Sequence, residues 1–140
     1  MPPLFVYGTL KPGEAAYSKY CAPYVSEATS AYMKGDLFHL PQGYPAMTDG
    51  DRWVQGALLQ LKSEQAIAQM DAFEDYNPTL SAAENLYTRQ HRPVFDRNHQ
   101  PLGTAWVYLM QRDRIEQSTG ILLPNGVWSQ QQWPSIQIDE

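Results

Sequence analysis

The segment that most constrains the fold is an amphipathic helix at residues 63–74, because the other patterned segments of the chain indicate β-strands. Its sequence, SEQAIAQMDAFE, repeats apolar side chains along one face at three- and four-residue spacing: Ala66, Ile67, Met70 and Phe73. This spacing is typical of a helix packed on a hydrophobic core. Ser63 is the expected N-cap, since its hydroxyl can accept a hydrogen bond from a free N–H of the first turn.

Glu74 is a carboxylate where this helix should carry an apolar side chain. At about 100° per residue, Glu74 projects between Ile67 and Met70, inside the apolar arc. A carboxylate aimed at a core loses hydration unless it is paired, protonated or beside a cavity, and its pKa then rises into the range that suits a general acid or base. The alternative is that the helix ends before Glu74 and the side chain reaches water. Periodicity alone leaves both interpretations open.

The remaining hydrophobic pattern predicts a sheet. Strands are expected at residues 3–9, 28–40, 54–61, 86–95 and 102–110. An interruption is expected in the second strand at Gly35 and Asp36, and Pro93 indicates that the fourth lies at an edge or carries a bulge. Both faces of 102–110 are apolar, so this strand is expected at the centre of the sheet.

The connecting segments complete the predicted fold. Asp49-Gly50 has the sequence of a hairpin turn, and a short helix is expected at 14–21, stopped before Pro23. The segment from Ile121 onward is expected to pack irregularly through its tryptophans, Trp128 and Trp133. Together these elements predict an α+β fold, a small mixed barrel-like sheet with one or two packed helices.

Composition and charge restrict the class of protein. A chain of 140 residues has the size of one domain, 1–140, and its last ten or so residues are expected to fray. The formal charge of −5 and the lack of a basic cluster argue against nucleic acid or an anionic membrane as a partner. The chain starts without the features of a signal peptide and carries a single cysteine, Cys21. We therefore expect a soluble, cytoplasmic protein, and its oligomeric state stays open.

No residue pattern indicates a metal or another cofactor. His39, His91 and His99 lack the spacing of metal ligands, and one cysteine cannot form a zinc cluster. Nothing around Cys21 indicates an activated thiol, and the glycine-rich phosphate-binding motifs are missing from the sequence. The expected protein works without a cofactor.

The tetrapeptide Tyr7-Gly8-Thr9-Leu10 stands where the first strand gives way to a turn. Glycine at such a position lets backbone N–H groups approach a ligand, and consecutive exposed amides can stabilise an anion or an oxyanion. The simpler interpretation is that Gly8 marks a bulge or a tight bend. The residues themselves leave this choice open.

The order of several motifs resembles the γ-glutamylcyclotransferase-like family, including its AIG2-like and γ-glutamylamine cyclotransferase branches. The family pattern is a Tyr-Gly-Ser/Thr-Leu tetrapeptide, a Gly-x-hydrophobic strand, a helix ending in Leu-Asp-x-x-Glu, and Tyr-x-Arg on the following strand. The matching segments here are FVYGTL, QGALLQL, MDAFE and YTR, and the likeness extends from residue 4 to about 128.

The resemblance implies an enzyme that acts on a small γ-glutamyl amine or γ-glutamyl amino acid. In this chemistry the substrate α-amine attacks its own γ-carbonyl, releasing an amine and leaving 5-oxoproline, so this transferase needs no metal or covalent intermediate. By the match, Glu74 is the general acid and base, and the backbone amides of Tyr7, Gly8, Thr9 and Leu10 hold the substrate.

Three further residues are candidates for substrate binding. Tyr44 and Tyr108 either line the pocket or are core residues with hydrogen-bonded hydroxyls. Arg89 either holds the substrate α-carboxylate or pairs with a surface acid, and Asp71 is a structural partner near Glu74. Because a fold does not determine its function, a non-catalytic domain that binds a small molecule or a partner is the alternative.

Overall fold

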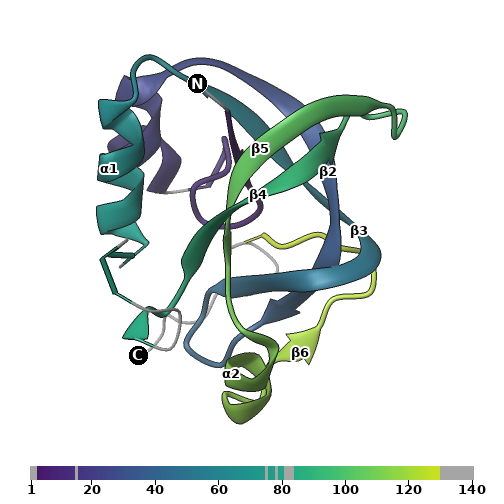
Figure 1. Cartoon of the computed structure of the whole chain (residues 1–140). Helices are drawn as coiled ribbons and strands as arrows, with labels where there is room; N and C mark the ends of the chain where they lie inside the picture. Colours follow the sequence, from purple (N-terminus) through teal and green to yellow (C-terminus); the bar gives the residue numbers. More distant parts are fainter. Residues whose placement is uncertain (1–2, 15, 75, 78, 81–83, 130–140) are drawn as a thin grey trace.

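The structure is a computed structural model that describes residues 3–14, 16–74, 76–77, 79–80 and 84–129. Its sheet has six strands: β1 (Leu4–Val6), β2 (Val25–His39), β3 (Pro45–Leu61), β4 (Thr88–Phe95), β5 (Pro101–Leu109) and β6 (Ile121–Leu122). The strand order is β3-β1-β5-β4-β2-β6, and β3 also pairs with β2, so the first five strands close into a barrel (Figure 1). This confirms the predicted α+β fold with a mixed, barrel-like sheet.

The strand β1 is short, yet it lies between two longer strands of the barrel wall. It pairs antiparallel with β3 and parallel with β5, and both of its faces are buried. Leu4 and Val6 belong to the apolar cluster that α1 (Gln65–Phe73) covers, whereas Phe5 and Tyr7 belong to a second cluster inside the barrel. Burial on both faces explains why this strand has no polar alternation.

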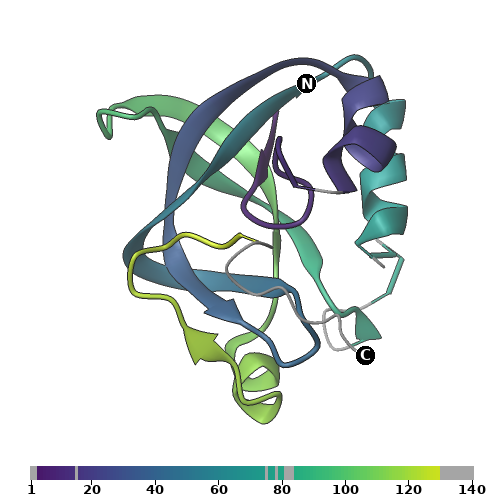
Figure 2. The same cartoon turned by 180° about the vertical axis from the view of Figure 1, so that it is seen from behind.

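The helices lie outside the barrel. The π-helical turn η1 (Tyr17–Cys21) continues into the short 3₁₀ helix η2 (Ala22–Tyr24), and Figures 1 and 2 both show η1 beside α1. The contact between them is buried, with Cys21 Sγ 3.4 Å from Met70 Sδ. The short helix predicted at 14–21 is observed as η1, which ends at Cys21 and so stops before Pro23 as expected. Pro23 stands in the first turn of the separate helix η2, where a proline is tolerated.

The interruption predicted in β2 is confirmed, whereas the hairpin turn predicted at Asp49-Gly50 is wrong. The pairing of β2 with β3 shifts between Gly35 and Asp36, where Gly35 opposes Arg52 and Asp36 opposes Thr48. Residues 49–51 are therefore a bulge within the long strand β3. A long-range interaction outweighs the local turn signal, because the Asp36 carboxylate packs on Gly50 and pairs with two arginines, Arg52 and Arg112.

Two helix predictions need correction. The helix α1 begins at Gln65, after Glu64, and it has no side-chain cap, so Ser63 is not its N-cap. A second helix, α2 (Arg112–Gln117), was not expected from the sequence. Only Ile115 of α2 is buried, so its hydrophobic pattern is too short to detect.

The segment after β6 docks on the barrel through Trp128. This side chain is fully buried, and its Nε1–H donates a hydrogen bond of 3.1 Å to Nδ1 of His39. Gly126 makes the approach possible: its φ is +68°, and a Cβ there would lie 1.9 Å from the Trp53 carbonyl oxygen. Packing through Trp128 is thus confirmed, whereas Trp133 and the predicted frayed tail lie outside the described residues.

Among the described residues, no helix combines the length and apolar character that crossing a lipid bilayer requires.

The bond between Trp128 and His39 predicts a pH-dependent stability. Burial lowers the pKa of His39 below its ordinary value of 6.5, and a protonated Nδ1 would face the indole N–H. The unfolded chain binds this proton more readily than the folded one, so stability falls as the pH drops from about 6.5 toward the lowered pKa. In urea titrations at pH values across this window, His39→Gln should flatten the fall relative to the native protein.

The exposed His91, replaced by Gln, is the control and should leave the pH dependence as it is in the native protein. A native-like fall in the His39→Gln protein would contradict the assigned role of His39.

Candidate active site

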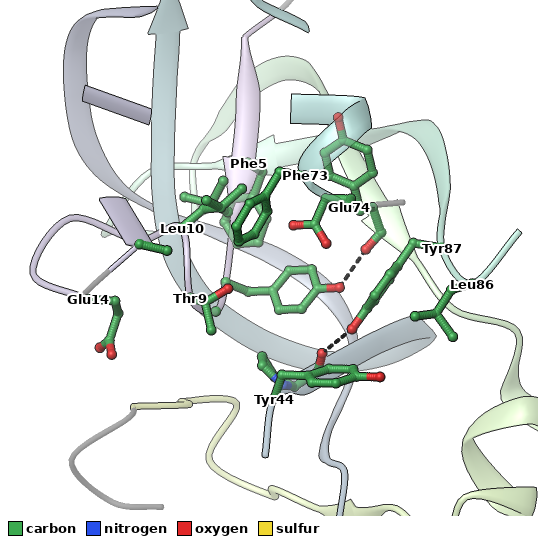
Figure 3. Close-up of a pocket in the computed structure, with 15 residues that line it drawn as sticks. Phe5, Thr9, Leu10, Glu14, Tyr44, Phe73, Glu74, Leu86 and Tyr87 are labelled. Atoms are coloured by element: carbon green, nitrogen blue, oxygen red, sulfur yellow. Dashed lines mark hydrogen bonds between the residues drawn. The ribbon is translucent and has the colours of Figure 1, made fainter. Parts of the chain in front are cut away.

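A cavity of about 420 Å³ opens between the end of β1, the last turn of α1 and the loop before β3. Aromatic and aliphatic side chains make most of its wall (Figure 3). The lining residues are Phe5, Val6, Tyr7, Gly8, Thr9, Leu10, Glu14, Ala16, Tyr44, Pro45, Phe73, Glu74, Leu86, Tyr87 and Tyr108. Glu74 and Glu14 are the charged members of this set, so the ionisable side chains of the described wall are both carboxylic acids.

Glu74 ends α1 at the wall of this cavity. Its backbone N–H still donates to the Met70 carbonyl at 2.9 Å, so the last turn stays intact and aims the side chain inward. In Figure 3 the carboxylate points into the space beside Phe73 and Tyr87. Burial raises the pKa of Glu74 to about 7. Of the two interpretations left open by periodicity, the structure supports the carboxylate beside a cavity.

The tetrapeptide Tyr7-Gly8-Thr9-Leu10 leaves β1 and forms one wall of the cavity. Glycine is required at position 8 because the Pro45 ring packs closely against the backbone there, and a Cβ would lie 2.4 Å from Cγ of Pro45. The Gly8 carbonyl accepts a hydrogen bond from the N–H of Lys11 at 2.9 Å, which closes the turn. Within the described part of the chain, the N–H groups of Gly8, Thr9 and Leu10 donate no hydrogen bond. These three amides remain available to an anionic ligand atom.

Two tyrosine hydroxyls tie the cavity wall together. Tyr7 donates to the Tyr108 carbonyl at 2.6 Å, and Tyr87 donates to the Pro45 carbonyl at 2.7 Å (Figure 3). Burial, together with the nearby Glu74 carboxylate, raises the pKa of both phenols well above the ordinary value of 10. Both tyrosines therefore stay neutral and act as hydrogen-bond donors that hold the wall in place.

A buried ionic network supports the helix that carries Glu74. The Tyr108 hydroxyl donates to Oδ1 of Asp71 at 2.6 Å, and Nε of Arg89 lies 3.1 Å from the same oxygen. The Arg89 guanidinium also lies over the ring of Trp106, 4.3 Å from its centroid. Asp71 is three residues before Glu74 on α1, so the network fixes the last turn of the helix against β4 and β5.

The structure brings most of the predicted site residues together. The tetrapeptide, Tyr44, Tyr108 and Glu74 all line the cavity. Tyr108 also has the hydrogen-bonded hydroxyl expected of a core tyrosine, so its two interpretations are compatible. Arg89 lies outside the lining set and pairs with Asp71, a buried acid of its own protein rather than a surface one. The position of Arg89 therefore does not support the predicted contact between its guanidinium and the substrate α-carboxylate.

Sequence reasoning missed several lining residues, of which Glu14 and Tyr87 carry polar groups. Tyr87 belongs to the Tyr-x-Arg motif, and a buried tyrosine before a strand was a usable signal. Glu14 was expected to begin the short helix at 14–21, and the structure places it in the turn before η1 instead.

The described residues contain no group of three or more His, Cys, Asp or Glu side chains that could hold a metal ion. The arrangement offers instead one carboxyl that titrates near neutral pH, three open amides and an apolar wall. Such a set can transfer a proton and stabilise a developing oxyanion in a substrate that carries its own nucleophile.

Comparisons with known proteins show to which protein family this chain belongs. The profile of the family "Gamma-glutamyl cyclotransferase, AIG2-like" matches residues 4–130. The chain belongs to this family. A relative from Niallia circulans, Gamma-L-glutamyl-butirosin B gamma-glutamyl cyclotransferase, is 32% identical over 117 residues, which cover 81% of this chain and 69% of the relative. The resemblance inferred from the motifs is confirmed.

Solved structures of the AIG2-like fold agree with the architecture. An AIG2-like protein from Mus musculus superposes with a TM-score of 0.69 at 19% identity, covering 92% of this chain and 88% of the mouse chain. YkqA from Bacillus subtilis gives a TM-score of 0.65 at 22% identity, and the match covers 96% of this chain but 42% of YkqA. At these identities the likeness establishes the fold alone.

The network at Asp71 predicts a measurable stability difference between two tyrosines. Tyr108→Phe leaves Oδ1 of Asp71 buried without its hydroxyl donor, so the free energy of unfolding should fall by about 1–3 kcal/mol. Tyr32→Phe is the matched control, because the Tyr32 hydroxyl donates no hydrogen bond within the described part of the chain and should cost under about 0.5 kcal/mol. Equal losses in urea unfolding would show that the bond to Asp71 does not hold the helix.

Proposed function

We propose that this member of the γ-glutamyl cyclotransferase family converts a small γ-glutamyl amine or amino acid to 5-oxoproline and a free amine, with Glu74 as the general acid and base. The observation that carries the proposal is the Glu74 carboxyl, which lines the cavity opposite the tetrapeptide and has a pKa of about 7. Near neutral pH this group is divided between its two protonation states, so it can both accept and return a proton.

The proposed reaction begins at the substrate α-ammonium. Glu74 takes a proton from the substrate α-ammonium, and the freed nitrogen bonds to the γ-carbonyl carbon of the same molecule. The bond from that carbon to the departing nitrogen then breaks. The lactam nitrogen keeps one hydrogen, and the departing nitrogen receives the two that were lost, so water is not consumed and no net proton is released.

The cavity wall would assist this reaction in two further ways, by stabilising the oxyanion and by confining the substrate. The amides of Gly8, Thr9 and Leu10 would stabilise the charge that develops on the γ-carbonyl oxygen, since none of them donates to another described residue. The aromatic wall from Tyr7, Phe73 and Tyr87 would confine the γ-glutamyl chain in a folded conformer. Confinement matters because the attack is intramolecular, and its rate depends on how often the amine lies near the carbonyl carbon.

Glu74→Gln tests the assigned role, because it keeps the size and a hydrogen-bonding side chain but cannot accept a proton. Purified native and variant proteins are incubated with a panel of γ-glutamyl amines and γ-glutamyl amino acids, and 5-oxoproline is quantified. We expect kcat to fall at least about a hundredfold in Glu74→Gln, the usual contribution of a positioned acid or base.

Glu64→Gln is the matched control, since Glu64 is exposed at the other end of the same helix and the charge change is identical. Equal rates for native protein and Glu74→Gln would remove Glu74 from the mechanism. Calorimetric binding of 5-oxoproline without turnover of any compound would favour the non-catalytic binding domain.

A further inference from the structure

The turn that carries the open amides is attached to the protein by two side chains. The N–H of Lys11 donates to the Gly8 carbonyl at 2.9 Å, and Thr9 and Leu10 stand between these two residues. The Leu10 side chain is buried in the apolar cluster that α1 covers. The Lys11 side chain reaches the other end of the chain, where its ammonium donates a hydrogen bond to the Trp128 carbonyl. The turn is therefore tied to two different parts of the molecule.

The segment after β6 is a firm attachment point for this ammonium, because its backbone is bonded to both long strands. The N–H of Leu123 donates to the Leu37 carbonyl of β2 at 2.8 Å. The Gly126 carbonyl accepts a hydrogen bond of 2.8 Å from the N–H of Gln55 of β3. The fully buried indole of Trp128 then fixes the end of the segment. Figure 2 shows this segment in yellow, running up to the purple turn that follows β1.

The residues that follow Lys11 add little to this attachment. Pro12 and Gly13 are exposed, whereas Lys11 is partly buried. Burial lowers the pKa of the Lys11 ammonium, an effect that the nearby Glu14 carboxylate opposes. A charged donor that has lost part of its hydration forms a stronger hydrogen bond to a carbonyl than it would in water. The bond from Lys11 to Trp128 is therefore well placed to keep the turn from moving away from the barrel.

The position of this turn matters because the amides must lie where negative charge develops. Oxyanion donors act only at hydrogen-bond distance from the oxygen that they stabilise, and a misplacement of about 1 Å can cost roughly a hundredfold in rate. The charge on the γ-carbonyl oxygen is largest in the transition state. A displaced turn should therefore lower kcat and leave substrate binding nearly unchanged.

We infer that Lys11 is a positioning residue of the reaction, whose bond to the Trp128 carbonyl holds the amides of Thr9 and Leu10 toward the cavity. The effect on turnover rests on the proposed function, in which these amides stabilise the oxyanion. Lys11 lies outside the set of residues that line the 420 Å³ cavity, so it acts through the turn and does not touch the substrate. The segment after β6 thus supports the active site from the far end of the chain.

Lys11→Met tests the inference, because it keeps most of the side-chain stem and removes the ammonium. The substrate is γ-glutamyl-n-butylamide, a member of the panel above whose departing group is neutral and cannot respond to the charge of Lys11. We expect kcat to fall at least about tenfold while KM stays within about twofold of the native value.

Lys34→Met is the matched control for this change. The exposed Lys34 ammonium also donates to a backbone carbonyl, that of Asp51, at 3.2 Å, and Lys34 lies outside the cavity wall. Both variants therefore lose one cation and one hydrogen bond of the same kind. Lys34→Met should keep the native kcat and KM.

Lys11→Cys allows the ammonium to be restored in the same sample. The new thiolate displaces bromide from 2-bromoethylamine, and the C–S bond that forms gives a side chain with the length and charge of lysine. Cys21 is spared because it is fully buried, and burial raises its pKa to about 12. We expect kcat to be low before this reaction and to recover most of the native value after it.

Relaxation of ¹⁵N nuclei in the backbone reports on the turn without any substrate. The order parameters of the Thr9 and Leu10 N–H groups should lie near 0.85 in the native protein, as in rigid backbone, and fall toward about 0.6 in Lys11→Met. If the native protein yields 5-oxoproline from no compound of the panel, the proposed function fails, and the order parameters still test the attachment of the turn.

Several results would overturn the inference. They are equal kcat values in Lys11→Met and Lys34→Met, a loss that appears in KM alone, and order parameters that Lys11→Met leaves unchanged. If Lys11→Met does not fold, the comparison of Lys11→Cys before and after aminoethylation decides. A kcat that stays low in the folded, aminoethylated protein would show that the ammonium does not position the turn.

Discussion

Desolvation of the Glu74 carboxyl is the constraint on which the organisation of this site depends. A pKa near 7 instead of the ordinary 4.5 means that ionising this group costs roughly 3 kcal/mol more in the folded protein than in the unfolded chain. The folded state binds this proton more tightly, so folding stability declines as the pH rises from 4.5 through about 7. Such a destabilising group persists only where the surrounding structure determines its position.

The barrel provides that position through its closure. Pairing with β2 holds the start of β3 in place, because His39 lies opposite Pro45 in the sheet. Pro45 in turn packs directly on Gly8. The hydroxyl of Tyr87 then fixes the Pro45 carbonyl, while Tyr7 links β1 to β5. The tetrapeptide and the carboxyl at the end of α1 thus belong to separate elements that these contacts join.

The network below the helix has a separate role. Asp71 and Arg89 share a buried ion pair, and Tyr108 satisfies the same carboxylate oxygen. A buried ion pair adds little net stability compared with apolar packing, but loss of one partner is costly. Its effect in this protein is to fix where α1 ends, which in turn determines where Glu74 points. The motif that contains both Asp71 and Glu74 therefore combines a supporting residue with the cavity carboxyl one helical turn further on.

Local patterns predicted those parts of the molecule in which local and long-range forces agree. The periodicity of residues 63–74 put Glu74 inside the apolar arc but left open whether its side chain reaches water. The Gly35-Asp36 break in β2 was visible because glycine disrupts strand alternation. The Asp49-Gly50 turn was mispredicted because Asp36 and Arg112, far apart in the sequence, hold that segment as a bulge. Glu14 was expected in a short helix, whereas its place at the cavity depends on the path of the turn that the chain makes there, which no sequence pattern reports.

Burial of the Glu74 carboxyl at the cavity wall raises its pKa to about 7, and this value can be measured directly. Protein labelled with ¹³C in the glutamate side-chain carboxyls allows a direct titration by NMR, and the resonance missing from Glu74→Gln identifies Glu74. We expect a midpoint near 7 for this resonance. A midpoint at the ordinary value of 4.5 would show that the carboxylate is hydrated and that burial does not shift its pKa.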